Sequence, residues 1–183
     1  MRVILERGRV IAVIATLIVV HAGLAPRMAI GTVHPDLLLL FALTLGLTGG
    51  MSRGQWTGFA LGLAADTLVR LPFGLWTIVL TVFGRQVGRA GGGALHLTTV
   101  VSAGIVGAGS FLATLAYAVA AALVGRSELI AWRTLWVALV VSVVNFLLAP
   151  VAVKVSDWAN ADLGTARARV GRQRSAPLSW GRS

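Results

Sequence analysis

Apolar residues along the chain fall into six blocks of membrane-spanning length, separated by breaks that contain glycine, proline or charged residues. The approximate bounds of these blocks are 9–25, 36–50, 55–71, 74–90, 97–124 and 134–154. The second, third and fourth blocks are short for a hydrocarbon core of about 30 Å, and the length of the fifth predicts a tilt or an extension past the surface. The pattern predicts an all-α fold, a polytopic membrane bundle of about six transmembrane helices.

Composition supports this class of protein. Of the 183 residues, 57% are hydrophobic and 12% are charged, and the mean hydropathy is +0.86. The chain has no cysteine, which excludes disulfides and thiolate metal sites. Its three histidines lie far apart without ligand spacing, so no metal site and no cofactor are predicted.

The distribution of basic residues predicts the topology. With both termini in the cytoplasm, four of the sixteen Lys and Arg residues fall outside, and the remaining twelve fall on the cytoplasmic side. The four outer residues are Arg27, Arg70, Arg126 and Arg133. The net charge of +10 is therefore interpreted as a topology signal and a contact with anionic lipid, not as a nucleic-acid site.

The sequence also predicts an anchor at the N-terminal end of the chain and a tail at the C-terminal end. The basic N-terminus and first block resemble a signal peptide, but Pro26 directly after Ala25 makes a poor cleavage site, so we expect an anchor. Residues 1–155 are predicted to form the transmembrane domain, and 156–183 a basic, mobile cytoplasmic tail. Arg167 and Arg169 would place that tail on an anionic leaflet, although a plain positive-inside tail explains the charges equally well.

Gly58, Gly62 and Asp66 are spaced four apart and share one face of the third predicted helix. The glycines would let a neighbouring helix approach closely, and Asp66 would be kept away from lipid, where it costs roughly 2.5–3.5 kcal/mol. Two partners are open for Asp66: Arg70 one turn later, or the start of the next helix after the turn at Pro72 and Gly74. A direct role in binding an ion, a proton or a ligand is a further alternative, and contact with a partner protein is another.

Other polar positions have simpler interpretations. Pro35 and Asp36 fit the first turn of the second helix, and Arg85 and Arg89 fit the inner headgroup layer. Asn145 is expected to form a hydrogen bond between helices. The fifth block holds two pairs of small residues, Ala103 with Gly107 and Gly104 with Ala108, which face either the bundle or another subunit. No nucleophile–base pair, HExxH or P-loop occurs, so no enzymatic activity is predicted.

The order of motifs resembles the MreD family of rod shape-determining membrane proteins. The resemblance covers about residues 33–90. It rests on "HPDLLLLFALTLGLTGG", on the register Gly54, Gly58, Gly62 and Asp66, and on "PFGLWTIVLTV" followed by "GRQVGR".

The resemblance implies a non-enzymatic scaffold of the bacterial cell-elongation complex in the plasma membrane. Such a scaffold binds MreC, a membrane protein with a single span, and helps to direct peptidoglycan synthesis by RodA and its class B penicillin-binding protein. MreB filaments are a further implied partner on the cytoplasmic side. The family fold is similar to the substrate-binding subunits of energy-coupling-factor transporters, so a small-molecule-binding subunit is the alternative function.

Overall fold

The computed structural model describes residues 10–19, 36–68, 73–91, 98–126 and 132–174, with side chains described as far as residue 160. These residues form six helices and no strand, so the all-α prediction is confirmed for this part of the chain. An N-terminal helix, Val10–Val19, is followed by α2 (Leu37–Gly49), α3 (Met51–Leu68) and α4 (Leu75–Gly91). Two longer helices, α5 (Thr99–Leu123) and α6 (Trp132–Arg174), complete the bundle.

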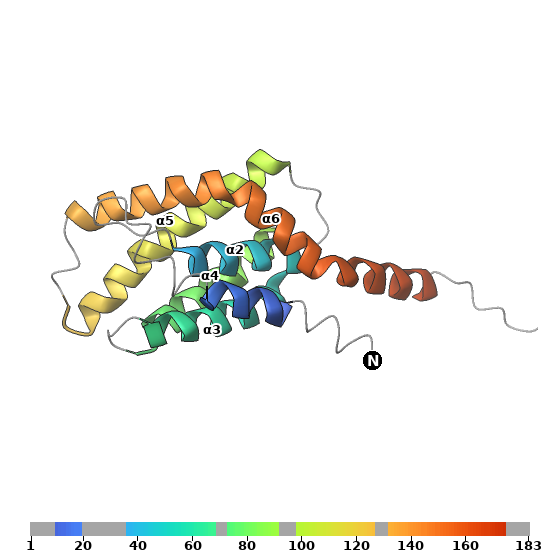
Figure 1. Cartoon of the computed structure of the whole chain (residues 1–183), viewed down its shortest axis with the longest axis horizontal. Helices are drawn as coiled ribbons and strands as arrows, with labels where there is room; N and C mark the ends of the chain where they lie inside the picture. The colour runs from blue at the N-terminus through green and yellow to red at the C-terminus, as the bar shows by residue number, and fades with distance from the viewer. Residues whose placement is uncertain (1–9, 20–35, 69–72, 92–97, 127–131, 175–183) are drawn as a thin grey trace, which may run out of the picture.

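The short helix α2 forms the centre of the molecule (Figure 1). Its apolar sequence is buried on nearly every side, and α3, α4, α5 and α6 all pack against it. With 13 residues it is about 20 Å long, which is shorter than the hydrocarbon core of a bilayer. Helix α2 therefore acts as the core element around which the other helices are arranged.

Helices α2 and α3 are joined by a single residue, Gly50, which has a φ of 84°. This conformation is unfavourable for residues with a Cβ, so glycine permits the sharp reversal. Gly74 has a φ of 104° and precedes α4 in the same way. The breaks that the sequence predicts at these two points are therefore confirmed.

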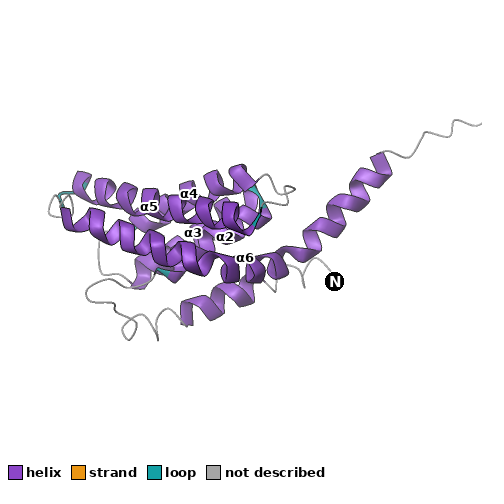
Figure 2. Cartoon of the chain, turned by 90° about the horizontal axis from the view of Figure 1, so that it is seen from above, coloured by secondary structure: helices purple, strands orange, loops and turns teal. Residues whose placement is uncertain are grey.

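Two helices are long and apolar enough to cross a membrane, namely α5 and the segment Trp132–Asn160 of α6. Figures 1 and 2 show that the C-terminal part of α6 projects beyond the remaining helices.

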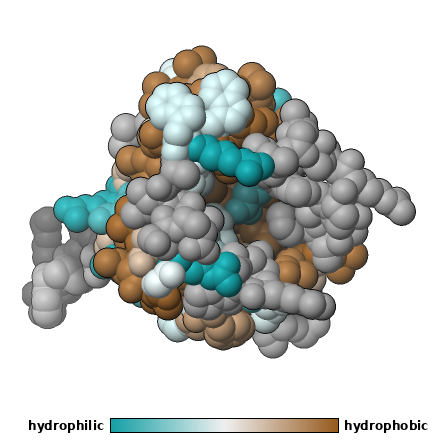
Figure 3. Space-filling model, turned by 90° about the vertical axis from the view of Figure 1, so that its left-hand side faces the viewer, coloured by the Kyte–Doolittle hydropathy of each residue, from teal (hydrophilic) through white to brown (hydrophobic). Residues whose placement is uncertain are grey.

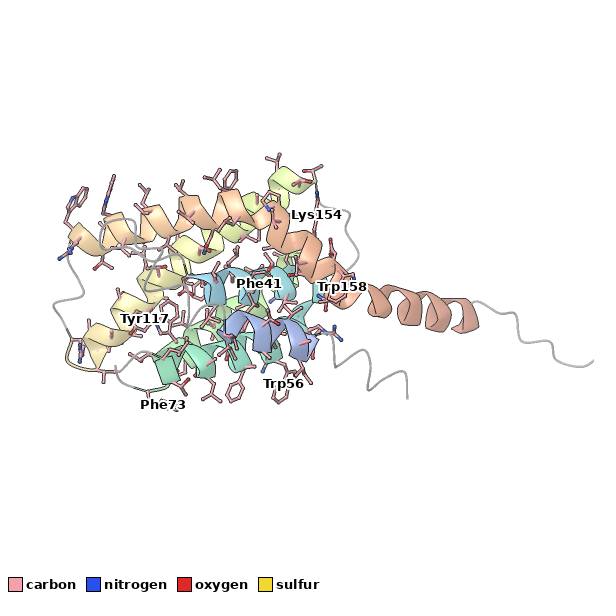
Figure 4. The ribbon with its side chains drawn as sticks, viewed as in Figure 1. Phe41, Trp56, Phe73, Tyr117, Lys154 and Trp158 are labelled. Carbon is pink, nitrogen blue, oxygen red and sulfur yellow. The ribbon has the colours of Figure 1, made fainter. Side chains whose placement is uncertain are left out.

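The bundle has two ends, which we name by residues labelled in Figure 4 or close to them. The Asp66 end carries Asp66, Phe73 and Tyr117, and the Arg53 end carries Arg53, Arg85 and Asn160.

The last apolar block was predicted to end near residue 154, but the helix that contains it is longer. Helix α6 continues through Pro150 and on to Arg174, so the predicted boundary between residues 155 and 156 lies within a helix. The added segment begins with Ser156, Ala159 and Asn160, which are buried in the bundle. Figure 1 shows that α6 changes direction along its length, and Lys154 lies near that change (Figure 4). Proline removes one helical hydrogen bond, which accounts for a bend without ending the helix.

Candidate functional site

Asp66 lies at the end of α3 and is 6% exposed. Its carboxylate accepts hydrogen bonds from the backbone N–H groups of Gly74 (3.0 Å), Trp76 (3.1 Å) and Thr77 (2.9 Å). The Thr77 hydroxyl donates a fourth bond of 2.6 Å. These donors belong to Gly74, which precedes α4, and to the first turn of α4, where backbone N–H groups lack helical partners and the helix dipole favours a negative charge.

Of the two partners expected for Asp66, the structure therefore shows that Asp66 binds the start of the next helix. Arg70, the other expected partner, lies outside the described residues, as does Pro72. The four bonds join the end of α3 to the start of α4 through one side chain. A carboxylate that accepts several backbone N–H bonds is held in one orientation.

Glycines hold the same two helices together along their length. A Cβ built on Gly58 would collide with the carbonyl group of Leu80, and one on Gly62 would lie 2.5 Å from the Cα of Thr77. A Cβ on Gly54 would likewise meet the carbonyl of Gly84. The backbones of α3 and α4 are thus in direct contact, as the four-residue glycine spacing predicts.

A polar network that sequence analysis missed occupies the Arg53 end. Asn160 of α6 donates to the Thr48 hydroxyl (2.7 Å) and to the Leu45 carbonyl (3.4 Å), and accepts from Arg53 (2.5 Å). One turn earlier, the Ser156 hydroxyl donates to the hydroxyl of Thr44 at 3.0 Å. These bonds fix the second half of α6 onto α2 and α3. The available signal was that Ser156 and Asn160 are four residues apart and therefore share one helix face.

Helices α5 and α6 cross at a second polar contact. The Asn145 amide donates to the Ser110 hydroxyl (2.9 Å), as expected of a bond between helices, and Ser142 donates to the Gly107 carbonyl (2.8 Å). Asn145 is fully buried, and its Oδ1 has no hydrogen-bond partner among the described residues.

The crossing of α5 and α6 also determines which small residues of α5 face the bundle. Ala103 and Gly107 are buried, and a Cβ on Gly107 would lie 3.2 Å from the Cβ of Phe146 on α6. Gly104 and Ala108 are exposed, and a Cβ on Gly104 would meet no atom within 4 Å. Of the two pairs predicted from the sequence, one therefore faces the bundle and the other faces outward.

The remaining candidate residues lie apart from Asp66. Asp36 caps α2 by accepting from the Leu39 N–H at 2.9 Å. Arg85 donates to Gln55 Oε1 at 2.7 Å, and Arg89 is exposed in the last turn of α4. Pro35 lies outside the described residues. The side chains of Arg167 and Arg169 are also outside them, although both residues belong to α6.

An aromatic pair lies beside Asp66. The rings of Trp76 and Tyr117 stack with centroids 4.4 Å apart and planes at 16°, which joins the start of α4 to α5. Two other tryptophans, Trp132 and Trp136 of α6, are 80% and 59% exposed. Exposed tryptophans at the end of an apolar helix are typical of anchors at a membrane surface.

No protein-family model, no curated protein and no solved structure matches the chain. The function is therefore inferred from the geometry of the described residues and from the motifs of residues 33–90.

Proposed function

We propose that the chain is a multi-pass protein of the bacterial plasma membrane with both termini in the cytoplasm. Support comes from the outer surface of the two long helices. Only 39% of an apolar 18-residue stretch of α5 and 28% of one in α6 is buried, whereas the core helix of a soluble protein is mostly buried. Seen from the Asp66 end, hydrophobic side chains form much of the described perimeter, and hydrophilic ones lie near the centre and at one edge (Figure 3). An apolar perimeter of this kind requires a covering of lipid or protein.

Within that membrane location, we propose a non-enzymatic scaffold of the rod complex, similar to MreD, that binds an MreC-like protein with one span. The observation that carries this proposal is that both oxygens of the Asp66 carboxylate accept hydrogen bonds that join α3 to the start of α4. With four donors on two oxygens, the acid is part of the frame, and an ion or a ligand could bind it only by displacing these bonds. Direct contact of the glycine faces adds rigidity, and a rigid bundle offers a fixed surface to a partner.

The partner set follows from the resemblance. Through the MreC-like protein, the scaffold would position or regulate RodA and a class B penicillin-binding protein, and so influence peptidoglycan synthesis and cell shape. MreB filaments and anionic lipid are the proposed contacts on the cytoplasmic side, where Arg85 and Arg89 lie in the proposed topology.

A substrate-binding subunit of an energy-coupling-factor type transporter is the second candidate. The stacked Trp76 and Tyr117 beside Asp66 favour it, because a small-molecule site combines aromatic walls with a few polar groups. Against it, Trp76 is already stacked and Asp66 is already bonded, so a ligand would have to displace contacts within the bundle.

Affinity purification of the full chain in mild detergent, followed by mass spectrometry, tests both candidates. Recovery of an MreC-like protein supports the scaffold, and recovery of an ATPase pair with a coupling subunit supports the transporter. Gly62→Leu should abolish partner capture because it separates α3 from α4, whereas Gly104→Leu is the matched substitution at an open position. Capture that survives Gly62→Leu at normal expression would contradict the role of this packing.

A further inference from the structure

The last turns of α4 carry positive charge at the Arg53 end, where α3 and α4 hold no carboxylate. Arg85 and Arg89 are both exposed there. Asp66 is the single acid in the sequences of α3 and α4, and it lies at the opposite end of the bundle. Asp36, at the start of α2, is also at that opposite end, and Asp157 belongs to α6, which packs on α2 and α5. The outer surface of α4 at the Arg53 end therefore attracts anions.

An amide side chain holds one of these two arginines in place. The Arg85 guanidinium donates to Gln55 Oε1 of α3 at 2.7 Å. Because the amide is neutral, this contact orients the guanidinium without cancelling its charge, and it uses one of the five N–H donors of the group. Arg89 lies one turn later on the same side of α4. Guanidinium groups bind phosphate oxygens through paired N–H bonds, so two neighbouring arginines suit two phosphates of one molecule.

An apolar surface begins at the level of the arginines. Exposed apolar side chains run along α3 from Met51 to Leu68, a rise of about 26 Å, which is close to the hydrocarbon core of about 30 Å. Met51 lies beside the last turns of α4, because a Cβ on Gly88 would be 3.0 Å from the Met51 Cα. Trp56 points away from the bundle (Figure 4), and its ring meets that of Phe59 edge to face with centroids 6.4 Å apart. A ligand that matches both surfaces has phosphates at one end and hydrocarbon chains along α3 and α4.

We propose that Arg85 and Arg89 bind a phospholipid with two phosphates, such as cardiolipin, whose acyl chains lie on Trp56, Phe59 and Val82. Basic sites between helices near the cytoplasmic surface are typical of this class of lipid. A lipid with one phosphate leaves one arginine without a counter-charge, and a soluble phosphate leaves the apolar surface uncovered. The inference rests on the membrane location and topology in the proposed function, and it specifies the chemistry of the anionic lipid proposed there.

Native mass spectrometry of the full chain in mild detergent measures the dissociation constants of tetraoleoyl cardiolipin and dioleoyl phosphatidylglycerol. We expect cardiolipin to bind more tightly, and the double variant Arg85→Gln, Arg89→Gln to bind it about 30-fold more weakly, because each basic residue near an anionic lipid contributes about a factor of five. Lys154→Gln is the matched control, because Lys154 is an exposed cation of α6 with Asp157 three residues later. Equal affinity for the two lipids, or an equal loss in the control, would refute a specific site.

Gln55→Glu tests whether the uncancelled charge of Arg85 matters. The new carboxylate still accepts a hydrogen bond from Arg85 but cancels its charge, so cardiolipin binding should fall about fivefold while the thermal midpoint does not fall. Unchanged binding in Gln55→Glu would refute the role of this charge.

Deacylated cardiolipin, which is soluble in water and keeps both phosphates, tests the apolar part of the site. At equal concentration it should not displace the intact lipid, because it cannot cover the surface around Trp56. Displacement would show that the acyl chains contribute nothing, and would refute a site for lipid.

The outcomes separate this inference from the proposed function. Loss of cardiolipin selectivity in the wild-type chain, with capture of an MreC-like protein retained, would contradict the lipid site alone. Selective cardiolipin binding without partner capture would contradict the scaffold alone. Release of the chain from membranes by alkaline carbonate without detergent would contradict the membrane location, and with it both proposals.

Discussion

Replacement of Asp66 by Asn tests the central bond of the bundle with almost no change of shape. One carboxylate oxygen accepts the bonds of Gly74 and both bonds of Thr77, and the other accepts the Trp76 N–H. The Asn carbonyl can keep the first set, but its NH₂ group then faces the N–H of Trp76. A lost bond to a charged group costs about 1.5–3 kcal/mol, and a lost charge at a helix N-terminus about 0.3–1 kcal/mol.

The expected loss of stability for Asp66→Asn is therefore about 2–4 kcal/mol. For a chain of this size, that corresponds to a fall in the thermal midpoint of roughly 4–16 °C. The midpoint is measured on detergent-solubilised protein by the fraction that remains monodisperse after heating. Asp157→Asn, an identical exchange at an exposed position of α6, is the control and should shift the midpoint by less than about 2 °C. Equal midpoints for the two variants would show that the bonds of Asp66 do not stabilise the bundle.

Three further substitutions follow from the geometry and use the same thermal assay. Gly58→Ala places a Cβ against the Leu80 carbonyl and should cost about 1–3 kcal/mol or more, whereas Gly104→Ala, in open space, should cost less than about 0.5 kcal/mol. Asn160→Ala removes three hydrogen bonds between α6 and helices α2 and α3 and should cost about 2–4 kcal/mol; a neutral effect would show that α6 is held by apolar contacts alone. Asn145→Leu should change stability by less than about 1 kcal/mol, because it removes an unpaired buried oxygen together with one bond; a loss above 2 kcal/mol would indicate that this oxygen has a partner.

The sequence was most informative where local chemistry determines the structure. The predicted block 36–50 corresponds to α2, and 74–90 corresponds to α4, because glycine and proline mark the turns between apolar runs. Asp36 was expected in the first turn of α2, and it caps that helix. Helix caps and tight turns depend on residues that are close in sequence, so their signals can be recognised in a single chain.

The second half of α6 shows why other features were not predicted. The residues after 155 lack a long apolar run, so hydropathy ended the last span at 154, yet the helix continues to Arg174. Its stability depends on Ser156 and Asn160 meeting Thr44 and Thr48 of α2, more than one hundred residues earlier. A contact of this kind depends on the bend in α6 and on the position of α2. Neither can be obtained from a periodicity within one helix.

The spacing of Gly58, Gly62 and Asp66 has a common geometric cause. The three glycines of α3 are four residues apart, and the carbonyls that a Cβ on each of them would meet are four residues apart along α4 in the opposite direction. Gly54 faces the carbonyl of Gly84, Gly58 faces that of Leu80, and Gly62 faces that of Trp76. One further step along α3 reaches Asp66, and one further step back along α4 passes the beginning of that helix at Leu75. Asp66 therefore meets unpaired N–H groups where the glycines met carbonyls, and a carboxylate is the side chain that such groups favour. The glycine contacts and the Asp66 cap are thus consecutive positions of one antiparallel register. A single residue inserted between Gly62 and Asp66 would turn the acid away from α4 and lose all four bonds.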